Sequence, residues 1–137
     1  MQELLQGLLE RLQSSGVGEV YASFDALPVE KKSHSCFTVV GLEQVKTGEG
    51  YPVERGVAYP FAAQLRVDIL TPMTENPQES QRIFFESIVP AMAQEECSLL
   101  RFDAGAPKPD LRLGRMVYGG TFCLLGVLCT QKEDDAA

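Results

Sequence analysis

The stretch FAAQLRVDILTPMTENPQESQRIFFESIVP, residues 61–90, changes its apolar spacing halfway along, and this change constrains the fold more than any other feature. Apolar residues occupy every second position of its first ten residues: Phe61, Ala63, Leu65, Val67 and Ile69. Successive side chains of a strand point to opposite faces of the sheet. The pattern therefore predicts a strand with one buried face.

The residues after this strand predict its end and the start of a helix. Thr71-Pro72 should end the pairing, because proline has no N–H to donate to the next strand. Asn76 can cap a helix, and Pro77 suits the first helical position. Glu79, three residues after the cap, can bond back to it.

The helix that follows is expected to bury one stripe of side chains and to be disturbed near its end. Pro90 removes the hydrogen bond to the Glu86 carbonyl, which predicts a kink or an early end. The spacing of about 3.6 residues places these residues on the buried stripe: Ile83, Phe84, Ser87, Ile88, Ala91 and Met92.

The rest of the chain predicts one more helix and several strands. Leucines on one face indicate an opening helix that closes at residues 14–16. Residues 46–58 are expected to form a long hairpin loop, and Gly119-Gly120 a two-residue hairpin turn with a bulge near Gly114. The apolar run 122–129 predicts a central strand covered on both faces. The remaining strands are expected at residues 19–24, 36–45, 97–102 and 111–118.

These elements predict an α+β domain in the order α-β-β-β-α-β-β-β. We expect a single mixed, mostly antiparallel sheet with two helices packed on it, and a parallel pair where the second helix crosses over. A chain of 137 residues fits one domain, which we place at residues 1–131. Residues 132–137 are expected to form a flexible acidic tail.

Charge and hydropathy restrict the partners. The net charge of −7 disfavours general binding to phosphate backbones. No apolar run approaches the roughly 20 residues of a membrane span, and the opening MQELLQGLLE is acidic where a secretory signal is basic. We therefore expect a cytoplasmic protein that binds neither membranes nor specific nucleic-acid sequences.

Several side chains could support chemistry, but each has a simpler explanation. His34 and Cys36 share one face of a predicted strand and could pair as base and thiolate, although a single histidine more often lies at a strand edge. The thiols Cys36, Cys97, Cys123 and Cys129 lack the spacing of a zinc site, so we expect them buried and reduced.

Acid pairs and glycines are also weak signals. Asp103 with Asp110, or Glu95 with Glu96, could form an acid pair, but turns and helix ends collect such residues. GEGYPVERG lacks the following Lys-Ser/Thr of a phosphate loop. We predict no enzyme, no metal and no cofactor.

The predicted loop 46–58 is the best candidate for an interaction site. An exposed aromatic side chain near an arginine is typical of interface anchors. A solvated hairpin tip is an equally good explanation. The candidate interface residues are Lys46, Glu49, Tyr51, Pro52, Glu54 and Arg55.

The order and pattern of the elements resemble one protein family over almost the whole chain. The segments that carry the likeness are LLQGLLERL, FTVVGLEQV, YPFAAQLRVDILTP, ESQRIFFESIVPAM and GRMVYGGTFCLLGVL. They are similar to the small tail-terminator and tail-completion (neck) proteins of long-tailed bacteriophages and prophages. The likeness lies in pattern rather than in a signature motif, so it transfers no functional residue.

The resemblance implies a structural protein of virion assembly. Such proteins form a ring, usually a hexamer, that binds the end of the tail tube, stops its polymerisation and presents a surface to the head. They need no cofactor and would be found in the host cytoplasm and the virion tail. A small bacterial ligand-binding or regulatory α+β domain without catalytic activity remains the alternative.

Overall fold

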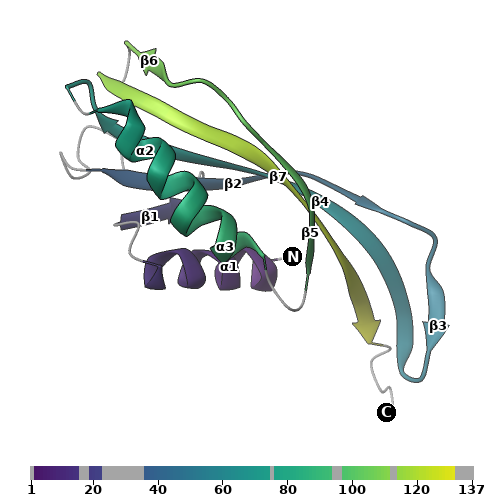
Figure 1. Ribbon diagram of the computed structural model, residues 1–137. Helices are drawn as coiled ribbons and strands as arrows, with labels where there is room; N and C mark the ends of the chain where they lie inside the picture. The colour runs from purple at the N-terminus through teal and green to yellow at the C-terminus, as the bar shows by residue number, and fades with distance from the viewer. Residues whose placement is uncertain are drawn as a thin grey trace.

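Figure 1 shows the computed structural model, in which one long, twisted sheet carries its helices on one face. The structure describes residues 2–15, 19–22, 36–74, 76–93, 97–111 and 114–131. The expected tail at 132–137, the pair Glu95-Glu96 and His34 lie outside these residues. None of the helices in the described part combines the length and apolar character that a membrane crossing requires.

Two helices and seven strands make up the described fold. The first helix is α1 (Gln2–Ser14), and the second runs through α2 (Pro77–Ile83), the π-helical turn η2 (Phe84–Ile88) and α3 (Val89–Met92). The strands are β1 (Glu19–Ala22), β2 (Phe37–Thr47), β3 (Tyr51–Val53), β4 (Gly56–Pro72), β5 (Ser98–Ala104), β6 (Lys108–Asp110) and β7 (Arg115–Gln131).

The sheet confirms the predicted α+β class. Its order is β1-β2-β4-β7-β5, with β3 paired to β4 and β6 paired to β7. Every pair is antiparallel except β1–β2. We expected the parallel pair to be the two strands that the second helix connects. These strands, β4 and β5, do not pair with each other, because β7 lies between them.

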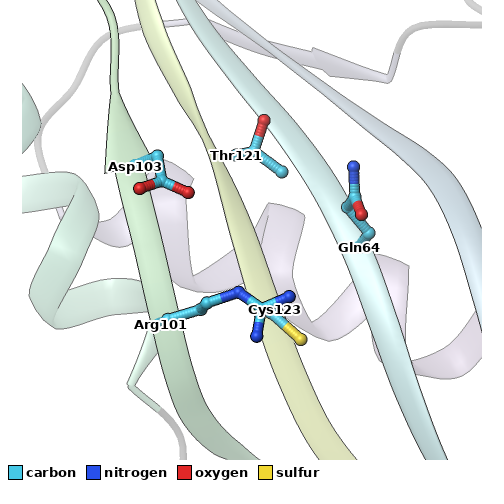
Figure 2. Close-up of a pocket in the computed structure, with 5 residues that line it drawn as sticks. All are labelled: Gln64, Arg101, Asp103, Thr121 and Cys123. Carbon is cyan, nitrogen blue, oxygen red and sulfur yellow. The ribbon is translucent and has the colours of Figure 1, made fainter.

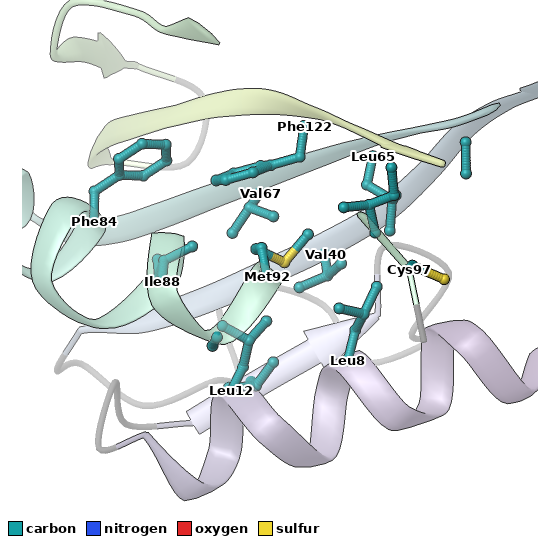
Figure 3. Packing of buried hydrophobic residues seen from close by; sticks show 14 of the residues in the cluster. Leu8, Leu12, Val40, Leu65, Val67, Phe84, Ile88, Met92, Cys97 and Phe122 are labelled. Carbon is teal, nitrogen blue, oxygen red and sulfur yellow. The ribbon is translucent and has the colours of Figure 1, made fainter. Parts of the chain in front are cut away.

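The core lies between the sheet and the helices. The predicted alternation of β4 is confirmed, since its odd-numbered residues from Phe61 to Ile69 are all buried. They meet Leu8 and Leu12 of α1 and the apolar stripe of the second helix, of which Phe84, Ile88 and Met92 are fully buried (Figure 3). The strand with apolar residues at every second position therefore packs against the helix with apolar residues at a spacing of about 3.6, as the switch in spacing predicted.

The second helix begins and ends where its sequence indicated. The Asn76 side chain accepts a hydrogen bond of 3.0 Å from the Gln78 backbone N–H. Near the other end, the Val89 N–H bonds to the Phe84 carbonyl, five residues back, and the helix ends at Met92. This wider turn directly precedes Pro90, whose ring would crowd the carbonyl four residues earlier in a regular helix.

Asn76 allows a direct test of the helix start. Changing Asn76 to Ala should lower the free energy of unfolding by about 1 kcal/mol, because a backbone N–H of the first turn loses its acceptor. Asn76→Asp is the matched control, since aspartate caps equally well. Urea titration of the three proteins would measure the difference, and equal stability of both variants would show that the cap contributes nothing.

The predicted Gly119-Gly120 turn is wrong, because both glycines lie inside the continuous strand β7. A Cβ atom on Gly119 would overlap the Val67 carbonyl oxygen, and one on Gly120 would overlap the Asp103 carbonyl oxygen. Glycine is thus required by the close approach of neighbouring strands rather than by a turn. The turn lies instead before β7, where Gly114, the expected bulge, has a φ of +64°.

The predicted hairpin loop at 46–58 is largely strand. Tyr51 pairs with Ala58 and Val53 with Gly56, so that only Glu54 and Arg55 remain in the turn. A Cβ atom on Gly50 would overlap the Tyr59 ring. Glycine here accommodates a side chain from the paired strand, and does not indicate an irregular loop.

Candidate functional site

Part of the sheet extends as an arm beyond the helices that cover its other end (Figure 1). We define the arm as residues 46–62 and 125–131, which comprise β3 and the adjoining ends of β2, β4 and β7. Tyr51 pairs with Ala58, which pairs in turn with Cys129, so these three residues form one row across the arm. The next outward-facing row along the arm pairs Pro60 with Val127.

One face of the arm is apolar and exposed. Tyr51, Val53, Leu125 and Val127 are 48%, 40%, 38% and 52% exposed. Pro60 and Cys129 are also exposed. We call this set the apolar strip: Tyr51, Val53, Pro60, Leu125, Val127 and Cys129.

The pairing register places the strip on the face opposite the helices. Ala63 pairs with Leu124, and both belong to the core on the helix side. Their neighbours Ala62 and Leu125 pair with each other and must point the other way, because side chains alternate along both strands. The prediction that residues 122–129 are covered on both faces is therefore wrong, since only alternate residues meet the helices.

The predicted interface residues all lie on the arm and are all exposed. Tyr51 belongs to the strip, and Lys46 faces the same side because it pairs with Ala62. Pro52 pairs with Val57 and faces the opposite side, while Glu54 and Arg55 form the turn. Glu49 lies in the short connection before β3.

The residues that sequence reasoning missed are those that β7 adds to the strip. TFCLLGVLCT, residues 121–130, is apolar at both parities and therefore resembles a strand buried on both faces. No local signal separates the exposed Val127 from the buried Leu124. The distinction depends on which face of the sheet the helices cover.

The four cysteines differ in solvent exposure, although the sequence predicted that all would be buried. Only Cys97 of the four is buried. Cys36 and Cys123 are half-buried, and Cys129 is exposed on the strip. The expectation of buried thiols is therefore wrong for three of them. Cys123 and Cys129 share the outward parity of β7, and Cys36 lies directly before the start of β2.

A polar hollow lies on the same outer face as the strip, closer to the middle of the sheet (Figure 2). It has a volume of about 200 Å³ and is lined by Gln64, Arg101, Asp103, Thr121 and Cys123. Asp103 pairs with Thr121, whereas Asp110 pairs with Arg115, six residues away along β7. That separation is about 20 Å, which is too far for the acid pair that the sequence allowed.

An exposed apolar ring lies on the helix side of the molecule. Phe85, at 49% exposure, contacts the half-buried Phe102 of β5 with ring centroids 6.2 Å apart. Leu100, also exposed, lies in the irregular step of β5 between Leu99 and Arg101. Leu99 and Phe102 face the core, and Arg101 pairs with Cys123 of the outer face, so Leu100 lies on the outer face with Arg101 and not beside Phe85.

Ion pairs lie near Phe85 on the second helix. Arg82 pairs with Glu79 and, at 3.1 Å, with Glu86. The hydrogen bond from Arg82 lowers the pKa of Glu79 below its usual value. Glu79 was expected to bond back to the helix cap and is found instead in this pair.

Comparisons with known proteins bear on the fold alone. No protein-family model and no curated protein matches the chain. Among solved structures 30 chains match, and one of them, whose name states no activity, aligns with a TM-score of 0.59 and 8% sequence identity. The alignment covers 96% of this chain and 99% of the other, so the two proteins share one architecture over nearly their whole length.

Proposed function

We propose that this protein is a subunit of a ring that caps the tail tube of a long-tailed phage or prophage and joins the tube to the head or neck. The observation that carries the proposal is the arm with its exposed apolar strip. Protein interfaces bury exposed apolar and aromatic side chains of this kind at their centre. A ring subunit needs such a surface, because each copy must hold the next one.

The charge distribution supports association through the arm. The whole chain carries a net charge of −7, but the arm holds two basic and two acidic residues and is neutral. No charged residue occurs between Met116 and Gln131. Two acidic copies repel each other over most of their surface, and the arm is where this repulsion is smallest.

The proposed partners are other copies of this chain, usually six in a ring, the tail-tube protein, and head-completion or neck proteins. The remaining acidic surface would keep passing DNA from adhering, because like charges repel. This role requires no catalysis and no cofactor. It places the protein in the host cytoplasm during assembly and in the virion tail afterwards.

The polar hollow favours the alternative function, a bacterial ligand-binding or regulatory domain. Arg101 and Asp103 offer opposite charges, and Gln64 and Thr121 offer neutral hydrogen-bonding groups. Such a set could hold a small polar molecule. The hollow is about half open to solvent, however, and the alternative leaves the apolar strip unexplained, so we favour the ring.

Val127→Lys is expected to prevent ring formation, because a charge would enter the centre of the strip and remain desolvated and unpaired in the interface. Light scattering across a concentration series should show rings for the natural protein and monomers for the variant. Electron microscopy with purified tail-tube protein should show capped tubes only for the natural protein. Genes for tail and head-completion proteins beside this one would identify the tube protein to use.

Leu111→Lys is the matched control, since Leu111 is an exposed apolar residue outside the arm. This variant should form rings as the natural protein does. If the natural protein neither associates with itself nor caps tubes at any concentration, the ring proposal is wrong. In that case the alternative predicts binding of a small molecule that Arg101→Ala abolishes.

A further inference from the structure

One edge of β7 lacks a partner strand among the described residues. On one side, β4 pairs with β7 along its whole length. On the other side, β6 pairs with residues 115–117 and β5 with residues 120–125. From Gly126 to Gln131 no described strand pairs on that side, and β7 forms a border of the arm there (Figure 1). We call this side of residues 126–131 the β7 edge.

The alternation of the backbone identifies the groups that the β7 edge presents. The Gly119 carbonyl accepts a hydrogen bond of 2.9 Å from the N–H of Gly105, the residue directly after β5. Backbone groups of every second residue point to the same side of a strand, and the pairing of β7 with β4 has no register shift. The N–H and C=O groups of Val127, Cys129 and Gln131 therefore point away from β4, to the β7 edge.

A hydrogen bond of β4 gives the same direction independently. The Pro60 carbonyl accepts a bond of 2.7 Å from the N–H of Gly48, which follows β2 on the side of β4 that is opposite to β7. Pro60 lies directly opposite Val127. In an antiparallel pair, such opposed residues either point toward each other or both point away. The backbone groups of Val127 thus point away from β4.

The β7 edge also lacks the features that protect the edges of sheets. Short strands, charged side chains, prolines and bulges normally prevent pairing with another chain. Pro52 of β3 and Pro109 of β6 have no N–H to donate. β2 and β5 each contain a register shift and charged side chains, and β1 is only 4 residues long. The segment GVLCTQ, residues 126–131, contains no charge and no proline, and its pairing with β4 is regular.

We propose that the β7 edge of one copy pairs with the β7 edge of a second copy as antiparallel strands. Among the described strands, every other edge carries a protecting feature, so the edge of β7 in another copy is the best match that this chain offers. Two identical antiparallel strands are related by a two-fold axis, and both copies then contribute the same residues.

The direction of the edge groups determines the register of the pair. When Cys129 lies opposite Cys129 of the second copy, Val127 lies opposite Gln131, and all the N–H and C=O groups of the β7 edge are bonded. A shift in one direction would bring Gln131 opposite Leu125, which already pairs with β5. A shift in the other direction would leave Val127 beyond the end of the second β7.

The pair does not rest on the proposed ring. Two copies satisfy each other's edges, so the assembly closes at a dimer. A ring that caps a tube meets different partners at its two ends, whereas the copies of a two-fold pair are equivalent. The pair is therefore a form of the protein outside the ring.

Amide hydrogen exchange of the full chain, followed by NMR across a concentration series, tests the pair. In the dilute protein the N–H groups of Val127 and Cys129 should exchange rapidly. Those of Leu128 and Thr130 should be protected at every concentration, because they point to β4. As sedimentation shows the 15.0 kDa chain converting to a dimer, exchange at Val127 and Cys129 should slow by at least about tenfold.

Two variants at one position separate edge pairing from a contact of side chains. Val127→Pro removes an N–H from the β7 edge and no bond to β4, and edge strands tolerate proline. Val127→Ala keeps the N–H and shortens the side chain. The dimer dissociation constant should rise by at least about tenfold for Val127→Pro and by a smaller factor for Val127→Ala. Thermal unfolding followed by circular dichroism should remain cooperative for both.

Several results would overturn the pair. One is a natural protein that stays monomeric up to its solubility limit, and another is a dimer whose Val127 and Cys129 amides still exchange rapidly. Equal losses for the two variants would place the contact on the side chains. Protection that appears only when purified tail-tube protein is added would identify that protein as the occupant of the β7 edge. None of these results bears on whether rings form, so the two proposals fail separately.

Discussion

Changing Phe84 to Ala is expected to lower the free energy of unfolding by about 3–5 kcal/mol, because removal of a buried aromatic ring leaves a cavity that neighbours fill only in part. Phe84 is fully buried in the middle of an aromatic cluster. Its ring centroid lies 5.5 Å from those of Tyr118 and Phe122 and 6.3 Å from that of Phe102. The loss therefore affects contacts to β5 and β7 at once.

The adjacent Phe85 provides the matched control. Phe85→Ala should cost less than about 1 kcal/mol, since half of that ring already meets solvent. Urea titration monitored by circular dichroism would measure both variants. A cost for Phe84→Ala below that for Phe85→Ala would contradict the buried stripe of the second helix.

Gly120→Ala is expected to be the second most damaging change, with a loss of about 1–3 kcal/mol. The new Cβ would overlap the Asp103 carbonyl oxygen of β5 and lie 3.0 Å from Cζ of Phe84. Backbone atoms cannot move aside as a flexible side chain can, so β5 and β7 would have to separate. Thermal unfolding would show the loss as a lower midpoint.

Two further variants make this test specific to the strand. Gly7→Ala in α1 meets no atom within 4 Å and should be neutral or stabilise by up to about 1 kcal/mol, because alanine favours the helix. Gly120→Asn should be at least as damaging as Gly120→Ala. Asparagine is well tolerated in a two-residue hairpin turn, so a stable Gly120→Asn protein would restore the turn that the sequence suggested.

The sequence alone predicted those helices and strands whose formation depends on interactions between residues close together in the chain. The alternation from Phe61 to Ile69 predicted β4, because only burial of one face produces that spacing. Asn76 and Pro77 fixed the start of the second helix, since a cap acts on the N–H groups directly after it. Pro90 likewise indicated the disturbance that appears as a π-helical turn and an early end.

The tertiary structure decided what depends on residues far apart in the chain. Gly119 and Gly120 match a hairpin turn by sequence, yet they are required by the backbones of Val67 and Asp103 in neighbouring strands. The same limit applies to the candidate site. Leu124 and Val127 are equally apolar but lie on opposite faces of β7, and the helices cover only the face that carries Leu124. Local spacing encodes which way a side chain points, but whether anything meets it there is a property of the assembled fold.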